Sequence, residues 1–366
     1  MTNVTLILPT YNERDNIKTL VSAIIGVFKN LSQYAVTILI VDDNSPDGTA
    51  SVVRELTQEY KNIRLLSKSK EGLGAAYIYG INYALKHSHP DLIIQIDADW
   101  QHNPLLLPDF FKKIESGVDI VIGSRYIKGG SIPGNWGLHR KIYSIVGNTI
   151  VRLGLGRLSP HDWTSGYRMY RREVFEKVYR GLEKYSGYTF QVAFLNKVIL
   201  EGFKVGEVPL QFADRVHGRS KIAPLSYIKN LLLYILDNST FIKYLIIGTI
   251  GFTVQTLVAK LFVTLRLFEG LAVGIGSFMA IVTNFLGNNL WTFSHSRIRG
   301  QKNILKKFIH FCVTSIGAVI IQVVVVSIGV FIWGKDAWFI LMILAIIFLV
   351  IPYNYFIYNK FIWKTR

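Results

Sequence analysis

Cysteine is nearly absent from this chain, since Cys312 is the single one among 366 residues. One thiol excludes a disulfide within the chain and a cluster of thiolate ligands around a metal ion. Cys312 lies in an apolar stretch, where we expect it to pack as a small apolar side chain.

Acidic residues are also scarce: 24 Asp and Glu stand against 41 Lys and Arg, which leaves a formal net charge of +17. A charge of this size can indicate a nucleic-acid-binding protein. However, the sequence contains no zinc-ligand pattern and no long Lys/Arg-rich block, and much of it is apolar. We therefore expect no nucleic-acid partner and attribute the charge to anionic lipid headgroups or phosphorylated ligands.

Charge is missing from long runs in the C-terminal part of the chain. Four stretches, at 243–265, 271–293, 308–333 and 338–360, can each cross a hydrocarbon core of about 30 Å, which takes roughly 20 residues. No Asp or Glu lies deep within any of them, which argues against an ion-coupled transporter. We expect four transmembrane helices.

The loops between these stretches predict an orientation. The loop at 294–307 contains five Lys and Arg and no acid, whereas the other two loops are each net neutral. By the positive-inside rule, this loop and both termini are cytoplasmic. The chain also begins with a strand-like alternation and no basic n-region of a signal peptide. We expect a multi-pass membrane protein whose N-terminal domain faces the cytoplasm.

An amphipathic segment precedes the first apolar stretch. As a helix, residues 223–238 would present one apolar face, made by Leu231, Leu232, Tyr234 and Ile235. We expect this helix to lie on the cytoplasmic leaflet. The predicted division is a domain at 1–222, an interfacial helix at 223–240 and a four-span domain at 241–366.

Strand and helix patterns alternate in the N-terminal half. The expected strands are 4–9, 37–41, 63–66, 92–96 and 118–123. The expected helices between them are 14–30, 51–60 and 74–87. This alternation predicts an α/β domain, in which helices cover both faces of a mostly parallel sheet.

Two carboxylates, Asp97 and Asp99, follow the fourth strand with one alanine between them. Ligands of open α/β sheets bind outside the carboxyl ends of the strands, so both acids should lie in a cleft. Carboxylates this close repel each other unless a cation lies beside them, and oxygen ligands suit Mg²⁺ or Mn²⁺. A surface turn is the alternative, because Asp is common in turns.

Two further loops should meet these acids at the same edge of the sheet. The segment PTYNE (9–13) follows the first strand and DDNSPDG (42–48) follows the second. Tyr11 could stack on a base, while Glu13 and Asp43 could accept hydrogen bonds from a nucleoside. Asp-rich loops are usually turns and caps, so the joint occurrence of three such loops is what predicts a nucleoside site.

Cationic residues that could hold phosphates come later in the chain. Arg125 follows the fifth strand, and Ser144 lies one helical turn after Arg140. Arg215 and Lys221 precede the amphipathic segment. Arginine offers a bidentate fork to phosphate. For each residue, a solvated surface or a contact with lipid headgroups is the alternative.

Six segments occur in the order PTYNE, VDDNSPDGT, DADWQHNP, GSRY, DWTSGYRMYRREV and FADRVHGRSK. Over about residues 1–225 they resemble the family 2 glycosyltransferases of the GT-A fold, and most closely the polyprenol (dolichol) phosphate mannose synthases. The C-terminal half, with NFLGNNLWTF, resembles the four-span GtrA-like membrane domain.

The resemblance implies roles for the residues that match these motifs. The nucleoside would be held by Pro9, Tyr11, Glu13, Val41 and Asp43. The diphosphate and the metal, Mg²⁺ or Mn²⁺, would be lined by Asp97, Ala98 and Asp99. The metal ligands would be Asp99 and Gln101, with Asp97 as a further candidate. Contacts with sugar or phosphate would come from Arg125, Arg215 and Lys221. The lipid phosphate would be bound by Arg140 and Ser144.

The implied reaction is metal-dependent, inverting transfer of mannose from GDP-mannose to a polyprenyl (dolichyl) phosphate at the cytoplasmic membrane face. The motifs separate this reaction poorly from glucosyl transfer from UDP-glucose, so that alternative stays open. A flippase activity of the membrane half is the alternative from another class. A processive polysaccharide synthase is disfavoured because no QxxRW motif occurs. Nothing indicates an obligate protein partner.

Overall fold

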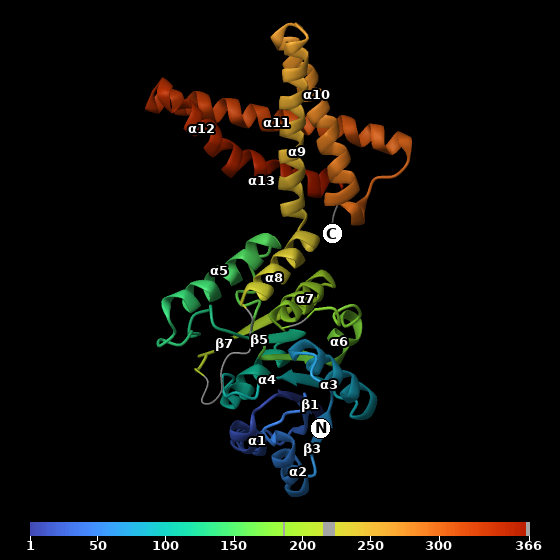
Figure 1. Ribbon diagram of the computed structural model, residues 1–366, viewed down its shortest axis with the longest axis vertical. Coiled ribbons are helices and arrows are strands. Elements are labelled where there is room, and N and C mark those ends of the chain that lie inside the picture. Colours follow the sequence, from blue (N-terminus) through green and yellow to red (C-terminus); the bar gives the residue numbers. More distant parts are fainter. Residues whose placement is uncertain (186, 215–223, 364–366) are drawn as a thin grey trace. The chain divides into compact units, whose positions relative to one another are not determined.

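The computed structural model describes residues 1–185, 187–214 and 224–363. The chain divides into two compact units, Met1–Asp237 and Asn238–Arg366. The first unit is built of strands and helices, coloured blue to yellow in Figure 1, and the second is built of helices, coloured yellow to red.

A seven-stranded sheet forms the centre of the first unit, in the order β3-β2-β1-β4-β6-β5-β7. Its strands are β1 (Thr2–Thr10), β2 (Tyr34–Asp42), β3 (Ile63–Ser67), β4 (Leu92–Gln95), β5 (Ile120–Ser124), β6 (Arg168–Arg171) and β7 (Val205–Pro209). All neighbours are parallel except β6, which is antiparallel to β4 and β5. The predicted mostly parallel sheet is confirmed.

Helices cover both faces of this sheet. One face packs against α1 (Arg14–Lys29), α2 (Thr49–Glu59) and α4 (Leu107–Glu115), which share an apolar core with the inward side chains of the strands. The other face packs against α3 (Leu73–His87), α6 (Arg172–Val178) and α7 (Gly187–Leu200). The central strands therefore bury side chains on both faces, which explains their continuous apolar runs.

Two strands, β6 and β7, are absent from the sequence-based prediction. The segment RMYR of β6 places an arginine at each end of a strand of four residues, and VGEVP of β7 contains Gly, Glu and Pro. Neither segment shows the β-branched, apolar composition by which strands are recognised.

Two amphipathic helices, α5 (Leu138–Gly154) and α8 (Pro224–Asn238), complete the first unit. In α8, Leu231, Tyr234 and Ile235 are buried, whereas Leu232 is 49% exposed. Asn196 of α7 donates a hydrogen bond to the Tyr234 hydroxyl at 2.9 Å. Three of the four residues of the predicted apolar face thus pack on the protein and Leu232 does not, while the position of this helix on the leaflet stays a prediction.

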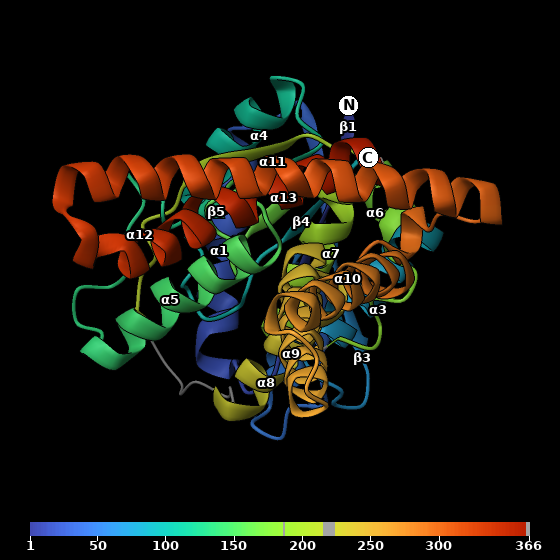
Figure 2. The ribbon, with the colours of Figure 1, turned by 90° about the horizontal axis from the view of Figure 1, so that it is seen from above.

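The described part of the second unit, up to residue 363, contains four helical stretches that are long and apolar enough to cross a membrane: Thr240–Thr264, Gly270–Thr292, Gln301–Trp333 and Ile340–Ile362. They comprise α9 (Thr240–Thr264), α10 (Glu269–Gly287), α11 (Gln301–Trp333), α12 (Trp338–Ala345) and α13 (Ile351–Ile357), with π-helical turns at Asn288–Thr292, Ile346–Val350 and Tyr358–Ile362. Figure 2 shows α11 as one continuous helix. The four predicted apolar spans are confirmed.

A buried amide, Asn289, fixes the loop after the second span. Its Oδ1 accepts hydrogen bonds from the Ile298 backbone N–H at 2.8 Å and from the Trp363 indole N–H at 3.0 Å. Its Nδ2 donates to the Ile298 carbonyl at 3.2 Å. Because a polar group buried in an apolar environment is costly unless it is paired, these bonds join the loop and the end of the fourth span to the second.

The close approach of α3 to the sheet depends on Gly80. A Cβ atom there would lie 2.9 Å from methyl groups of both Ile7 and Val41. We predict that Gly80→Ala lowers the free energy of unfolding by about 1–3 kcal/mol, because the crowded core must shift. The matched control is Gly26→Ala on α1, where a Cβ would meet nothing within 4 Å.

The control should leave stability unchanged or raise it by up to about 1 kcal/mol, since alanine favours helix more than glycine does. Denaturant unfolding of the full chain in detergent, followed by tryptophan fluorescence, measures both. Equal effects of the two substitutions would contradict this account of the packing.

Candidate active site

The carboxyl edge of the sheet gathers the predicted loops. The loops after β1, β2 and β4 leave it at neighbouring positions, because these strands are parallel and adjacent. Since β6 runs antiparallel and Arg168 pairs with Gln95, the segment 162–167 before β6 reaches the same edge. The loops after β5 and β7 also start there, with Ser124 paired to Pro209.

In the loop after β2, two of the acids shape the turn. Asp42 accepts hydrogen bonds from the hydroxyls of Thr10 at 2.9 Å and Ser45 at 2.6 Å. Asp47 accepts from the backbone N–H groups of Arg14 and Thr49, and so joins the starts of α1 and α2. These two carboxylates explain part of the acidity of this loop as turn structure.

The neighbouring carboxylate, Asp43, is placed differently. It is buried, and its Oδ1 lies 3.6 Å from the Lys68 ammonium. Burial raises the pKa of Asp43, and the charge of Lys68 offsets part of that increase. Asp43 is one of the predicted nucleoside-binding residues. It is thus a buried carboxylate that directly follows β2 and lies beside a cation.

The other predicted nucleoside-binding residues lie around it. Pro9 and Val41 are buried partners in the register of β1 and β2. The Tyr11 ring is partly exposed and lies 3.5 Å below the Lys70 ammonium. Glu13 precedes α1, and its carboxylate accepts a hydrogen bond from the Asn16 amide at 2.8 Å.

The loop after β4 holds Asp97 from several sides. The Tyr77 hydroxyl donates to Asp97 Oδ1 at 2.8 Å, and the Asp97 backbone N–H donates to His102 Nδ1 at 2.9 Å. Burial and the charge of Asp97 raise the pKa of Tyr77 well above its usual value, so the hydroxyl remains a donor. A Cβ atom on Gly166 would lie 3.4 Å from Asp97 Oδ2, so the segment before β6 passes close to this carboxylate.

Asp99 and Gln101 are brought together by the conformation of Trp100. Trp100 has φ +65°, a left-handed value that is rare for a bulky residue. The Gln101 backbone N–H donates to Asp99 Oδ1 at 3.2 Å, and the Gln101 side chain donates to the Ala213 carbonyl at 3.3 Å. Asn12 and Asn44, in the loops after β1 and β2, also have left-handed φ values, of 57° and 55°.

The residues around Asp97 fit a hard divalent cation by donor chemistry. Two carboxylates and an amide oxygen are the ligand types of Mg²⁺ and Mn²⁺. In the part of the chain that the structure describes, no group of three or more His, Cys, Asp or Glu could hold a metal ion. Mg²⁺ is commonly held by one or two carboxylates, with waters and substrate phosphates as its other ligands.

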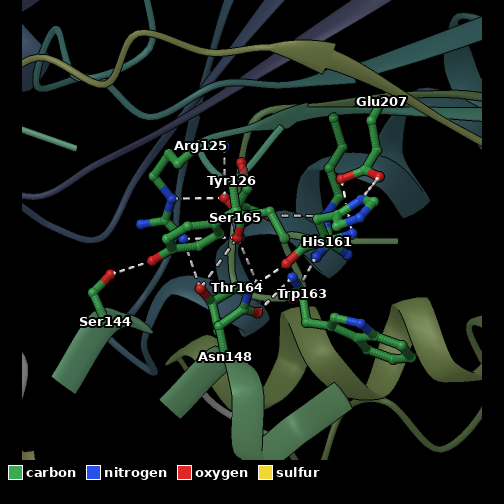
Figure 3. Close-up of polar contacts among 11 residues, drawn as sticks. Arg125, Tyr126, Ser144, Asn148, His161, Trp163, Thr164, Ser165 and Glu207 are labelled. Atoms are coloured by element: carbon green, nitrogen blue, oxygen red, sulfur yellow. Dashed lines mark hydrogen bonds and ion pairs between the residues drawn. The ribbon is translucent and has the colours of Figure 1, made fainter. Parts of the chain in front are cut away.

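Arg125 forms a buried ion pair, shown in Figure 3. Its Nε and Nη2 donate to the two carboxylate oxygens of Asp162, each at 2.7 Å, and its Nη2 also donates to the Thr164 hydroxyl. Burial alone would raise the pKa of Asp162, but the charge of Arg125 and the hydrogen bonds outweigh it and hold the pKa below its usual value. Arg125, which is predicted to contact sugar or phosphate, is thus held in place by the 162–167 segment.

A second buried arginine, Arg168, holds the backbone of this segment. Its guanidinium donates to the carbonyl oxygens of Trp163, Ser165 and Gln191 at 2.9–3.0 Å. Burial lowers the pKa of Arg168 to about 10, so the side chain is charged at neutral pH.

Sequence reasoning missed Asp162 and Arg168. Both lie in DWTSGYRMYR, a motif that supports the family resemblance but by itself suggests no role for either residue.

Of the predicted lipid-phosphate residues, Arg140 stacks on an aromatic ring. Its guanidinium lies 3.7 Å from the centre of the Trp136 ring and 3.8 Å from a carboxylate oxygen of Asp214. Ser144, one turn along α5, shares a hydrogen bond of 2.6 Å with the Tyr126 hydroxyl (Figure 3).

Tyr126 follows Arg125 in the chain, so α5 borders the Arg125–Asp162 pair. Arg215 and Lys221, the other predicted cations, lie outside the described residues.

The Arg125–Asp162 pair should carry much of the local stability. We predict that Asp162→Asn lowers the free energy of unfolding by about 3–5 kcal/mol at pH 7, because it leaves a buried guanidinium unpaired. The matched control is Glu176→Gln, which breaks the exposed Arg172–Glu176 pair of the same 2.7 Å length and should cost at most about 1 kcal/mol.

The effect of Asp162→Asn should depend on pH. A carboxylate with a lowered folded-state pKa stabilises the fold above its unfolded pKa of about 3.9, and this contribution disappears as the pH falls below that value. The difference between wild type and Asp162→Asn in denaturant unfolding should therefore shrink below about pH 4. A difference that stayed constant down to pH 2 would refute the ion-pair account.

Residues 5–179 match the family described as Glycosyl transferase family 2, and residues 243–363 match the GtrA/DPMS transmembrane domain. A polyprenol monophosphomannose synthase of Mycolicibacterium smegmatis is 39% identical over 220 residues, covering 60% of this chain and 80% of that protein. A dolichol-phosphate mannosyltransferase of Pyrococcus furiosus is 32% identical over 332 residues, covering 88% of this chain and 89% of that protein.

Two solved structures show weaker likeness. Glucosyl-3-phosphoglycerate synthase of Mycobacterium tuberculosis has a TM-score of 0.46 and 18% identity, covering 64% of this chain and 78% of that one. Mannosyl-3-phosphoglycerate synthase of Rubrobacter xylanophilus has a TM-score of 0.45 and 20% identity, covering 64% and 72%. From the sequence matches over both units, and from the sheet and its loops, it follows that this chain is a GT-A-fold glycosyltransferase of family 2, and belongs to the polyprenol (dolichol) phosphate mannose synthases that carry a GtrA-type membrane domain.

Proposed function

We propose that this enzyme transfers mannose from GDP-mannose to a polyprenyl phosphate at the cytoplasmic face of the membrane. The observation that carries the proposal is the convergence of three acidic loops with the anchored Arg125 at one sheet edge. The names of the relatives support the sugar and the lipid class. The basic loop at 294–307 supports the orientation, by the positive-inside rule.

The donor nucleotide would bind across the loops after β1 and β2. The partly exposed ring of Tyr11 offers a surface for the base, and the carboxylates of Glu13 and Asp43 offer acceptors for base and ribose groups. Pro9 and Val41, which are buried partners on β1 and β2, would line the nucleoside site beneath these side chains. The diphosphate would then extend towards Asp97, Ala98 and Asp99, in the loop after the adjacent strand β4.

Asp99 and Gln101, with Asp97 beside them, would hold Mg²⁺ or Mn²⁺. When bound, such an ion neutralises charge on the departing diphosphate. The protein's own part is to fix these side chains: Tyr77 and His102 hold Asp97, and the backbone N–H of Gln101 holds Asp99.

The acceptor needs no general base. A phosphate monoester has a second pKa of about 6, so it is largely dianionic at neutral pH and is already a nucleophile. One of its oxygens would attack the anomeric carbon as the bond to the diphosphate breaks, which inverts that carbon and releases GDP. Arg140 and Ser144 would position the acceptor phosphate, and catalysis then rests on orientation.

Helix α5 supports a lipid acceptor, because it exposes an apolar surface next to these residues. The exposed residues are Leu138, Ile142, Tyr143, Ile145, Val146, Ile150 and Leu153. A large exposed apolar face on a helix that also contains Arg140 is typical of contact with a membrane surface.

The metal site can be tested by substitution at Asp99. We predict that Asp99→Asn lowers kcat/KM for GDP-mannose by at least about a hundredfold, because an amide replaces a charged metal ligand. A loss of this size is typical when an enzyme loses one group that stabilises developing charge. The control is Asp109→Asn, an exposed acid on α4 that should leave turnover unchanged.

The measurement is transfer of radiolabelled sugar to polyprenyl phosphate with saturating Mg²⁺ or Mn²⁺, with GDP-mannose and UDP-glucose offered separately. Full turnover by Asp99→Asn, or full activity after exhaustive chelation, would refute the metal site. Preference for UDP-glucose would replace the mannosyl assignment by a glucosyl one.

The acceptor site can be tested at Arg140. We predict that Arg140→Ala raises the KM for polyprenyl phosphate about tenfold and leaves the KM for the donor unchanged, because one charge-assisted contact with the phosphate is lost. Lys141→Ala, one residue further on α5, is the control, since its ammonium bonds the Gly134 carbonyl. Acceptor kinetics that do not change in Arg140→Ala would remove this residue from the site.

A further inference from the structure

A basic pocket of about 510 Å³ lies at the start of α11 in the second unit. It is lined by Ile298, Arg299, Asn303, Lys306, Lys307 and His310. All six residues come from the second unit, so the pocket does not include the residues proposed to bind the sugar donor or the acceptor.

The lining of this pocket combines positive charge with hydrogen-bond donors. Arg299, Lys306 and Lys307 are cationic, Asn303 offers an amide, and among the residues that the structure describes no carboxylate lines the pocket. The segment from 294 to 310 contains no Asp or Glu at all. Like charges gathered in one pocket repel each other, and a bound anion would relieve that repulsion. The pocket is therefore suited to a phosphate, which arginine and lysine bind through charge-assisted hydrogen bonds.

The walls of the pocket are held by the rest of the second unit. Asn289 binds both the N–H and the carbonyl of Ile298, and so fixes the loop on one side. The Lys307 ammonium donates to the Phe361 carbonyl at 2.7 Å, which joins α11 to the end of the fourth span. The first-turn N–H groups of α11, a helix of 33 residues, add the positive end of the helix dipole.

An apolar side chain continues the pocket face along α11. Val313, which follows Lys306 by seven residues and His310 by three and so lies on the same face of the helix, is 60% exposed. It lies in a helical stretch that is apolar enough to cross a membrane, so hydrocarbon is the medium expected beside it. A ligand that suits both parts has a phosphate for the cations and a hydrocarbon chain for the adjacent helix surface.

We propose that this pocket binds the phosphate group of a membrane lipid. Two sources share this chemistry, a phospholipid headgroup and a polyprenyl phosphate. Basic pockets between membrane helices are known to select anionic headgroups in this way.

Lipid binding can be measured on the full chain in detergent by native mass spectrometry. The test variant is Arg299→Gln with Lys306→Gln, which removes two lining charges. The matched control is Arg297→Gln with Lys302→Gln, which removes two charges from the same segment at positions outside the pocket lining. The probes are phosphatidylglycerol, a polyprenyl phosphate, uncharged diacylglycerol and inorganic phosphate.

We expect one molecule of phosphatidylglycerol or of polyprenyl phosphate to bind more tightly than diacylglycerol. Whichever of these two lipids binds more tightly is the preferred ligand of the pocket. The test variant should weaken that binding at least about tenfold, since two charge-assisted contacts are lost, and the control by less than about twofold. Equal weakening in both variants, no preference over diacylglycerol, or inorganic phosphate binding as tightly as the lipid would each overturn the proposal. Elution of both variants as the wild-type species checks that they fold.

Discussion

The buried pair between Arg125 and Asp162 is the interaction on which the candidate active site depends. Asp162 has no exposed surface and accepts hydrogen bonds from Arg125, Thr164 and Ser165. It therefore joins the end of β5 to the segment that leads into β6. A charge this deep in the protein is stable only when it is paired and fully hydrogen-bonded. Arg168 donates hydrogen bonds to backbone carbonyl groups of the same segment, so two buried arginines fix the conformation of residues 162–167.

The central strands could be predicted from the sequence because strands that are buried on both faces have a continuous apolar composition. β1, β2 and β4 pack against helices on both faces, so they contain unbroken apolar runs that end in polar loops. The loops after them could be predicted to meet because parallel neighbours end at one edge. For the same reason, Asp43, Asp97 and Asp99 could be selected as candidates without a structure.

The parts that could not be predicted are those in which polar residues are buried. β6 contains Arg168, which is fully buried because backbone carbonyls satisfy its guanidinium, and no local pattern indicates that arrangement. The turn-forming roles of Asp42 and Asp47 differ from the placement of Asp43 only through three-dimensional contacts. In α8, periodicity indicated an apolar face but could not show that Tyr234 and Ile235 pack on the protein and not on lipid.

The left-handed residues Asn12, Asn44 and Trp100 have a consequence for how ligands meet the enzyme. Asparagine adopts this conformation at small cost, whereas for tryptophan it costs of order 1–3 kcal/mol and persists only where the surroundings enforce it. This conformational energy is lost when the chain folds, and not when a ligand binds. If Asp99 and Gln101 bind the substrate as we propose, this loop is preorganised for it, and less ordering entropy would be lost when the complex forms.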